Sequence, residues 1–593
     1  MKNHYNSYIL FSLLFLQIIF GISLNAKVAK PGLITAQQPD GSLINIRLEG
    51  NEQNKAAYSE DGFLLTYDSE GFYVIATTDE NGNLVSSGIR QINPETRNSG
   101  TIKFLQSIDR TGVTEALKSH RTKNKLNTRG PGLFSDPCVP MGKQKGLAIL
   151  VQFDDLEFTI EDPKDHFYRM LNEENFSDGG ATGSARDYYI ENSGGLFYPE
   201  FDVYGPVTLD KSYTYYGENN TWGEELNSPR MISEACALIN DEVDFSEYDL
   251  NGDGYVEMVY VFYAGYGEAD GGPSNSVWPH SWSLTEGIGW PLMKDDVYID
   301  TYACSNELQF GSNKPDGIGS FVHEYGHVIG LPDLYNTSYS SGPFTPGFYD
   351  AMDAGSYNNN SHTPPNFSSF ERYALDWLEP IVIDSETEIE LLPLGENNRA
   401  YILPTENENE FFLFENRQRT GNDAFIPGEG MLVWHIDFVQ EVWDYNEVNN
   451  DAKHQHVDII EADGKRNYRT SDGDTFPGAA GITELTPFSE PTYMTWSDTC
   501  PAFSIREISE DGDIIRFKTV ATENLPEAGV TSLTEEMKIL NIEGHNLSCK
   551  TGIAEIYDIS GRKLTLVGQN IVTLNPGLYI ARVNGTTLKF MIK

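Results

Sequence analysis

The sequence HEYGH at residues 323–327 decides how the centre of this chain is interpreted. Positions i and i+4 of an α-helix lie on one face, so the imidazoles of His323 and His327 can hold one zinc ion together. Glu324 stands beside the first histidine, where it can act on a water molecule bound to the metal. Zinc lowers the pKa of such a water to about 7 and polarises a carbonyl group. The motif therefore predicts hydrolysis in which Glu324 accepts a proton from water and passes it to the leaving amine.

The residues that follow predict a third ligand. Gly330 can take the left-handed conformation that ends a helix, and Pro332 prevents simple continuation of it. The chain is therefore expected to turn back, so that Asp333 offers a carboxylate and one coordination position stays open, as a catalytic zinc requires. His362 and Glu371 are the alternative third ligands.

A second pattern, YDAMDAG at residues 349–355, places Met352 in a short turn downstream of the histidines. A methionine turn beneath the metal is typical of the metzincin group of zinc proteases. Together the two patterns predict a metzincin-like α/β domain in which Met352 has a structural role. The competing interpretation is a polar helix with two surface histidines and no metal.

The loop DLNGDGYVE at residues 249–257 matches the first half of an EF-hand calcium loop. The expected oxygen ligands are Asp249, Asn251, Asp253, the carbonyl of Tyr255, and Glu257. Tyr260 stands where a bidentate glutamate would close the loop, so a neighbouring carboxylate such as Asp244 or Glu247 would have to complete the site. We expect structural calcium here, with a plain turn as the alternative.

Hydrophobic patterns divide the rest of the chain into segments. An apolar run at residues 8–24, followed by Ala26, predicts a signal peptide over 1–26, with a membrane anchor as the alternative. No other run approaches the ~18 apolar residues of a membrane span, so the mature chain is expected to be exported without one. The remaining segments are a β-rich pro-segment with a basic linker (27–132), the catalytic domain (133–380), a β-sandwich (381–522) and a C-terminal β module (528–593).

Composition narrows the set of partners. The 593 residues contain 88 acidic and 41 basic side chains, which gives a formal net charge of −47. This charge disfavours binding to nucleic acid and suits binding of calcium.

Five widely spaced cysteines without a CxxC pair exclude a disulfide scaffold. Cys138 follows the basic linker and is either a structural cysteine or a thiolate that caps the zinc. The segment before it is either a removable pro-segment or a permanent binding domain.

The stretches HEYGHVIGLPDLY and YDAMDAGSYN resemble the immune inhibitor A family of secreted metallopeptidases, as do weaker stretches across about residues 145–520. The resemblance implies a zinc endopeptidase made as a zymogen, usually with calcium sites. Carried over, His323 and His327 match the zinc ligands and Glu324 matches the base. Some members have an acidic residue directly after the position of Asp333, whereas this chain has Leu334 there. This difference removes one candidate ligand.

The C-terminal module, residues 528–593, alternates apolar and polar residues around Gly turns and is more basic than the rest of the chain. It resembles the sorting domain read by the type IX (Por) secretion system. That resemblance implies transfer across the outer membrane by secretion machinery, and a secreted or cell-surface protein. A generic β domain is the alternative.

The expected function is hydrolysis of peptide bonds in extracellular proteins and peptides by a zinc metalloendopeptidase. Two other functions stay open: a catalytically inactive adhesion or binding protein, and a zinc hydrolase of a non-peptide bond. The presence of Glu324 disfavours the first of these, because an inactive site needs no base.

Overall fold

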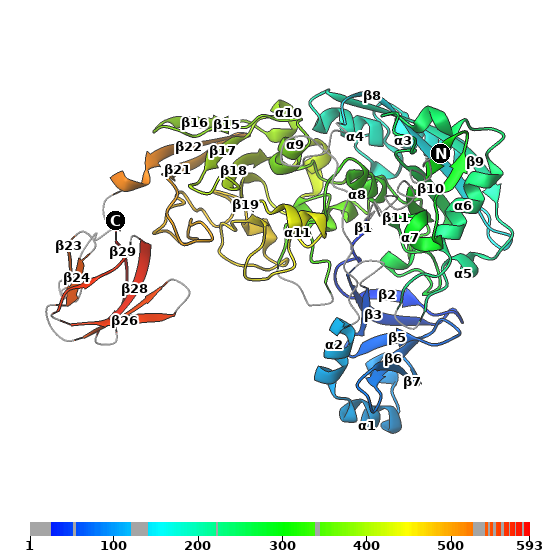
Figure 1. Ribbon diagram of the computed structural model, residues 1–593, viewed down its shortest axis with the longest axis horizontal. Coiled ribbons are helices and arrows are strands. Elements are labelled where there is room, and N and C mark those ends of the chain that lie inside the picture. The colour runs from blue at the N-terminus through cyan, green and yellow to red at the C-terminus, as the bar shows by residue number, and fades with distance from the viewer. Residues whose placement is uncertain are drawn as a thin grey trace, which may run out of the picture.

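A computed structural model of the protein describes most of the chain (Figure 1). The described residues are 25–50, 55–119, 140–220, 223–338, 344–525 and, in the C-terminal module, 540–543, 546–549, 553–558, 562–568, 570–575, 577–583 and 586–592. Most of the predicted signal peptide, most of the basic linker and Cys138 lie outside the described residues.

A six-stranded sheet forms the centre of the region predicted to be the catalytic domain (residues 133–380), called the catalytic region below. It lies in the upper right of Figure 1. Its order is β1 (Asn25–Ala26), β11 (His280–Ser283), β14 (Thr301–Leu308), β10 (Val259–Tyr266), β8 (Gly142–Gln152) and β9 (Phe197–Thr208). The last four strands are parallel, whereas β11 and β1 run antiparallel to their neighbours. The first described residues of the chain, which form β1, therefore extend the sheet by pairing with β11.

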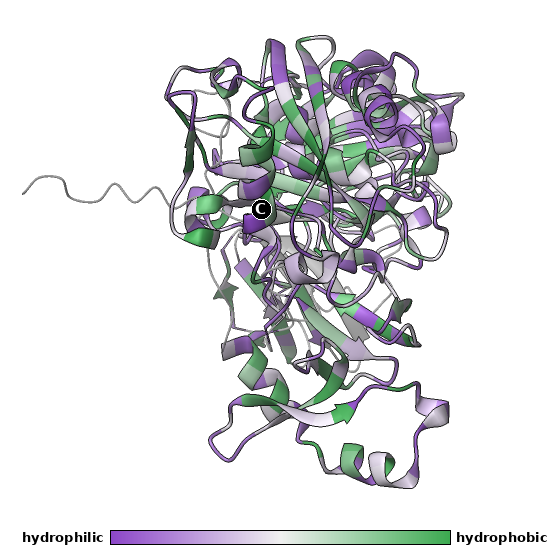
Figure 2. Ribbon diagram, turned by 90° about the vertical axis from the view of Figure 1, so that its right-hand side faces the viewer, coloured by the Kyte–Doolittle hydropathy of each residue, from purple (hydrophilic) through white to green (hydrophobic). Residues whose placement is uncertain are grey.

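Both faces of this sheet are covered. In β8, Ala148 and Leu150 belong to one hydrophobic core, and Ile149 and Val151 to another, because alternate side chains of a strand point to opposite faces. Figure 2 shows green, hydrophobic segments along these strands. These strands are therefore buried on both faces.

Helices pack on each side of the sheet. They are α3 (Pro163–Asn172), α4 (Ala185–Asn192), α5 (Tyr213–Tyr216), α6 (Ser228–Leu238), α7 (Leu284–Ile288), α8 (Gly319–Val328) and α9 (Ser369–Ala374). α8, which carries the histidine motif, buries Phe321 and Val322 in the same core as Leu150, whereas α6 packs on the opposite face. The helix that the spacing of His323 and His327 predicts is confirmed as α8. Short 3-10 turns and one hairpin complete the region: η2 (Asp178–Gly180), η3 (Phe245–Tyr248), η4 (Glu268–Asp270), β12 (Leu292–Lys294), β13 (Val297–Ile299), η5 (Gly347–Tyr349) and η6 (Ala354–Tyr357).

The N-terminal region is an antiparallel sheet, drawn in blue below the catalytic region in Figure 1. Its strands are β2 (Ile34–Gln37), β3 (Leu43–Glu49), β4 (Ala56–Ser59), β5 (Leu64–Tyr67), β6 (Tyr73–Thr78) and β7 (Leu84–Arg90). After η1 (Pro94–Thr96) come two helices that the sequence patterns did not predict, α1 (Ser99–Ser107) and α2 (Arg110–Ser119). α2 buries Val113 and Leu117 against this sheet, a short apolar stripe hidden among polar residues.

The region after residue 380 contains two packed sheets, as predicted for a β-sandwich. One consists of β15 (Ile381–Val382), β17 (Tyr401–Pro404), β18 (Glu410–Arg417), β19 (Gly430–Asp437) and β20 (Val457–Ile459). The other consists of β16 (Glu388–Leu391), β22 (Ile514–Ala521) and β21 (Phe503–Asp511). Between and after the strands lie α10 (Leu394–Asn397), η7 (Gly421–Phe425), α11 (Gln440–Asp444), η8 (Ser471–Gly473) and η9 (Thr522–Asn524).

One face of the larger sheet belongs to the catalytic region. Phe412 and Val433 lie in the core between the two sheets, whereas Leu413 and Trp434 lie in the core that also buries α8. The catalytic and β-sandwich regions are therefore joined by continuous hydrophobic packing, which the division at residue 380 did not anticipate.

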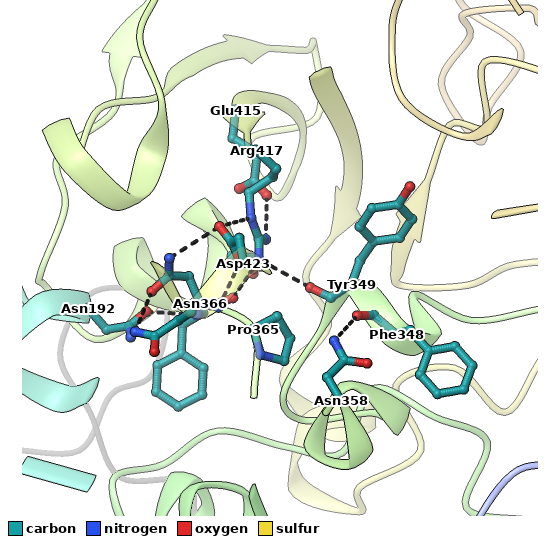
Figure 3. Close-up of polar contacts among 12 residues, drawn as sticks. Asn192, Phe348, Tyr349, Asn358, Pro365, Asn366, Glu415, Arg417 and Asp423 are labelled. Carbon is teal, nitrogen blue, oxygen red and sulfur yellow. Dashed lines mark hydrogen bonds and ion pairs between the residues drawn. The ribbon is translucent and has the colours of Figure 1, made fainter. Parts of the chain in front are cut away.

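A buried arginine adds a polar connection at the same junction (Figure 3). Arg417 of β18 donates to Asp423 at 2.9 Å and to Glu415 at 3.0 Å. Its Nη2 also donates to the backbone carbonyls of Asn366, at 3.0 Å, and Tyr349, at 3.4 Å, in the catalytic region. The carbonyl of Tyr349 lies three residues before Met352, so this network fixes the segment that contains the methionine turn.

The C-terminal module is a small pair of sheets, at the left of Figure 1. One holds β23 (Leu540–Glu543), β24 (Asn546–Cys549) and β27 (Val572–Thr573), and the other holds β26 (Lys563–Val567), β25 (Ala554–Asp558), β28 (Gly577–Val583) and β29 (Thr586–Ile592). Leu547, Ile556 and Val567 share its core. Across the described ranges, no helix has the length and apolar character to cross a membrane.

Replacing Arg417 with methionine tests the junction. The substitution keeps side-chain volume but leaves Asp423 and Glu415 as buried charges without their cation. We expect the free energy of unfolding to fall by about 3–5 kcal/mol, the usual cost of breaking a buried ion pair. Denaturant unfolding followed by tryptophan fluorescence measures the change.

Arg506 provides the control, because its ion pair with Glu484 is 3.0 Å long but exposed to solvent. Arg506→Met is expected to leave the unfolding midpoint nearly unchanged. Equal midpoints for the two variants would contradict the role assigned to Arg417.

Candidate metal centre

Helix α8 presents the two histidines of the motif from one face. The Nδ1 atom of His323 lies 2.9 Å from the carbonyl oxygen of Ala351, and that of His327 lies 2.8 Å from the carbonyl oxygen of Leu331. A carbonyl only accepts hydrogen bonds, so each Nδ1 carries the proton of its ring. In the neutral form of each ring, Nε2 then carries no proton, and its lone pair is available to a metal.

The turn after α8 brings Asp333 to the same point. Its Oδ1 lies 3.2 Å from Nε2 of His323 and 3.3 Å from Nε2 of His327, and the two Nε2 atoms lie 3.3 Å apart. Ligand atoms about 2.0 Å from a tetrahedral zinc are separated by roughly 3.3 Å, so the three distances fit that ion. Among the described residues, this is one of two groups whose atoms could hold a metal together.

Burial and protonation at this point also fit a cation. Oδ1 of Asp333 is buried and has no hydrogen-bond partner, as expected when the two facing nitrogens carry no proton. Burial lowers the pKa of His327, which favours the neutral ring that a metal binds. With both rings neutral, three buried lone pairs face one another, and a cation between them would stabilise this arrangement, so these residues fit zinc.

The conformation of the turn agrees with the sequence prediction. Gly330 has a φ of 104°, and Leu331 donates from its amide to Gly326 at 3.0 Å. Asp333 is then held by Asn446, which accepts from the Asp333 amide at 2.8 Å and donates to Oδ2 of the carboxylate. Asn446 follows α11 in the β-sandwich region, and the sequence gave no signal for its role.

The turn that contains Met352 packs against α8. A Cβ atom on Gly326 would meet Sδ of Met352 at 2.5 Å, so this close contact requires glycine. The neighbouring Ala351 provides the carbonyl that orients His323, and Met352 accepts from the amide of Leu334 at 3.0 Å. The side chain of Leu334 is fully buried in the hydrophobic core.

Glu324 faces Lys27, the first residue after the predicted signal peptide. Its Oε1 accepts from the amide of Lys27 at 2.7 Å, whereas Oε2 is buried without a hydrogen-bond partner. Burial, and next the charge of Asp333, raise the pKa of Glu324 well above its usual range. A carboxyl group of this kind can hold a proton and release it again.

The segment around Lys27 lies across the site as an extended peptide. Asn25 and Ala26 pair antiparallel with β11, opposite Ser281 and His280. Beyond them, Nε1 of Trp278 donates to the carbonyl of Lys27 at 3.0 Å, and the hydroxyl of Tyr357 donates to that of Val28 at 2.8 Å. The sequence predicted a pro-segment but not which of its residues reach Glu324.

The alternative third ligands lie elsewhere. The ring of His362 packs against Gly179, and Glu371 forms a capping box with Ser368 at the start of α9. The second group that could hold a metal, Asp437, His454 and His456, lies in the β-sandwich region and was not predicted.

The predicted calcium loop, residues 249–257, forms a tight turn. Asp249 accepts from the amides of Gly252 at 2.8 Å and Gly254 at 3.0 Å, and Glu257 accepts from Leu250 at 3.0 Å. Gly254 has a φ of 89°, as the sharp turn requires. Of the two neighbouring carboxylates considered to complete the site, Glu247 pairs with Lys145 at 2.5 Å and Asp244 accepts from Ser246. Calcium binding stays a prediction.

Comparisons with known proteins agree with this geometry. Residues 141–380 match the family described as immune inhibitor A peptidase M6, catalytic domain. Over 269 residues the chain is 25% identical to Immune inhibitor A of Bacillus thuringiensis subsp. alesti. This match covers 38% of the chain and 38% of that protein. Over 273 residues the chain is 26% identical to the pre-pro-metalloprotease PrtV of Vibrio cholerae serotype O1 (strain M66-2). This match covers 39% of the chain and 29% of that protein. The family match covers less than half of the chain, and the chain spans well under half the length of these curated relatives.

Replacing Asn446 with alanine tests how Asp333 is positioned. The carboxylate would lose the amide group that fixes Oδ2, and we expect zinc affinity to fall by about 10–100-fold, the usual effect of removing a partner of a metal ligand. Competition with a fluorescent chelator measures the affinity, and circular dichroism checks that the variant is folded. Asn409→Ala, at an exposed position of the same region, is the control. Unchanged affinity in Asn446→Ala would contradict the assignment.

Proposed function

We propose that the protein is a secreted zinc metalloendopeptidase that is synthesised as a zymogen. One observation carries the proposal: three unprotonated ligand atoms converge on a buried point, beside a glutamate that contacts the backbone nitrogen of an extended peptide. The match of residues 141–380 to the peptidase M6 family and the similarity to Immune inhibitor A and to a pre-pro-metalloprotease support it. A metzincin-like catalytic fold is part of the same proposal, supported by the methionine turn.

His323, His327 and Asp333 would hold the zinc ion. When bound there, zinc supplies a Lewis acid that polarises a carbonyl group and acidifies water. Glu324 is placed to accept a proton from water, because its carboxylate is buried and has one oxygen without a partner. The same carboxylate lies 2.7 Å from a peptide nitrogen, so it can return the proton to the amine that leaves.

Residues 27–132 would act as a removable pro-segment. While the amide of Lys27 is bonded to Glu324, a substrate cannot reach the carboxylate. Cleavage in the basic linker would separate this segment from the catalytic region and allow it to leave the site. If the signal peptide ends at Ala26, Lys27 becomes the first residue of the exported chain, and the nitrogen that faces Glu324 is then its α-amino group rather than an amide. This mode of latency does not need Cys138, which lies outside the described residues.

Other parts of the proposal rest on the sequence alone. They are export by the signal peptide at 1–26, structural calcium at 249–257, and recognition of residues 528–593 by the outer-membrane secretion machinery, which delivers a secreted or cell-surface enzyme. Substrates would be extracellular proteins and peptides. The peptide-like binding of residues 25–28 favours this class over a non-peptide substrate, and the retained Glu324 disfavours an inactive binding protein.

Cleavage of unfolded casein by the purified chain, before and after light trypsin treatment, tests the function. We expect activity to appear after trypsin treatment and to disappear when a chelator removes zinc. Glu324→Ala is expected to lower kcat by about 10²–10⁴-fold, because proton transfer is lost while the three ligands stay. Glu379→Ala, at an exposed position of the same domain, is the matched control.

Zinc content is measured on the same samples. A protein that binds no zinc would contradict the proposal and favour an adhesion or binding role. Bound zinc without cleavage of casein or of a mixed peptide library would favour a zinc hydrolase acting on a non-peptide bond.

A further inference from the structure

The side chain of Lys27 fills a pocket next to the proposed metal centre. It is only 3% exposed, although lysine is rarely buried. Its Nζ donates to the hydroxyls of Ser320 at 2.7 Å and Ser361 at 3.3 Å. The same nitrogen lies 4.0 Å from Oδ2 of Asp316 and 4.0 Å from the centre of the Tyr357 ring. These groups surround a single positive charge on several sides.

The walls of the pocket belong to the elements that build the metal centre. Ser320 lies on α8, one turn before Glu324, and Asp316 precedes that helix. Tyr357 ends η6, which follows the methionine turn. The pocket therefore remains beside Glu324 when the pro-segment leaves.

The pocket is acidic and buried. Asp316 accepts from Ser320 at 3.2 Å and from Gln309 at 3.3 Å. Asp270 lies nearby with Oδ1 buried and without a hydrogen-bond partner, and burial together with the charge of Asp316 raises the pKa of Asp270 to about 6. Removing Lys27 would leave these carboxyl groups without the cation they now face, which is unfavourable in a buried place.

The contact with Glu324 fixes which substrate residue this pocket would receive. In peptide hydrolysis the base returns a proton to the nitrogen of the residue that follows the cleaved bond. The nitrogen of Lys27 occupies that position, 2.7 Å from Oε1 of Glu324, while residues 25–26 precede it along β11. Lys27 thus stands where the residue on the carboxyl-terminal side of the cleaved bond would bind.

We propose that this pocket, formed by Asp316, Ser320, Ser361 and Tyr357, makes the enzyme selective for peptide bonds on the amino side of lysine. The proposal rests on the proposed function and names its substrate class. Lysine is favoured over arginine because the partners converge on one point charge rather than on a planar fork. An acidic side chain would face Asp316 and Asp270, and an apolar one would leave them without a cation.

Matched peptides test the selectivity of the trypsin-activated enzyme. Quenched-fluorescence peptides contain the sequence Asn-Ala-Lys-Val-Ala, which copies residues 25–29, or carry arginine, alanine or glutamate in place of lysine. We expect kcat/KM for the lysine peptide to exceed that for the alanine peptide by roughly tenfold or more, with glutamate poorest. Mass spectrometry should locate the cut between alanine and lysine. Similar kcat/KM values, or cleavage after lysine, would overturn the proposal.

Variants of the pocket sharpen the test. Asp316→Asn keeps the shape of the side chain but removes its charge, so the ratio of kcat/KM for lysine over alanine peptides should fall toward one. Asp296→Asn, at an exposed position of the same region, should keep the wild-type ratio. A ratio that Asp316→Asn leaves unchanged would overturn the role of this carboxylate.

Binding separates the pocket from the reaction. Calorimetry on the activated protein compares the amides of Lys-Val-Ala and Glu-Val-Ala, which contain no bond to be cleaved at this position. Affinity for the lysine peptide should be roughly tenfold higher or more, and equal affinities would overturn the proposal whether or not any peptide is cleaved. Cleavage without lysine preference would overturn the pocket alone, whereas selective binding without any cleavage would support the pocket and contradict the proposed function.

Discussion

The central constraint in this protein is the meeting of three unprotonated, buried atoms within 3.3 Å of one another: Nε2 of His323, Nε2 of His327 and Oδ1 of Asp333. Such a group is electrostatically unfavourable without a cation. The surrounding chain nevertheless holds each ligand in place, through the carbonyls of Ala351 and Leu331 behind the imidazoles and through Asn446 behind the carboxylate. A fold that stabilises this arrangement is organised around a metal ion.

The β-sandwich region contributes to the site rather than merely following it. Asn446 and Arg417 both lie outside the segment, residues 141–380, that matches the peptidase family. Asn446 orients Asp333, the proposed third ligand, and Arg417 contacts the backbone of Tyr349, shortly before Met352. Because the two regions also share one hydrophobic core, we expect neither to keep the geometry of the metal centre alone. The N-terminal region contributes from the other side, where the backbone nitrogen of Lys27 contacts Glu324.

Sequence patterns could predict the parts of the site that depend on local geometry. The helix that carries His323 and the turn at Gly330 follow from spacing and backbone preference, and Met352 follows from a family-like pattern a short distance away. Asn446 could not be predicted, because it lies 113 residues from Asp333 and nothing in its neighbourhood marks it as a partner. The contact of Lys27 with Glu324 spans 297 residues and depends on how a strand adds to β11, which periodicity does not encode. Helices α1 and α2 were missed because their apolar stripes are short and weak.

The most direct test of the metal centre is anomalous diffraction from crystals of the full chain grown with zinc, recorded on both sides of the zinc absorption edge. We predict one strong peak within about 2.0–2.2 Å of both Nε2 atoms and of Oδ1 of Asp333. No peak at this position, or a zinc ion bound there without Asp333, would contradict the proposed centre.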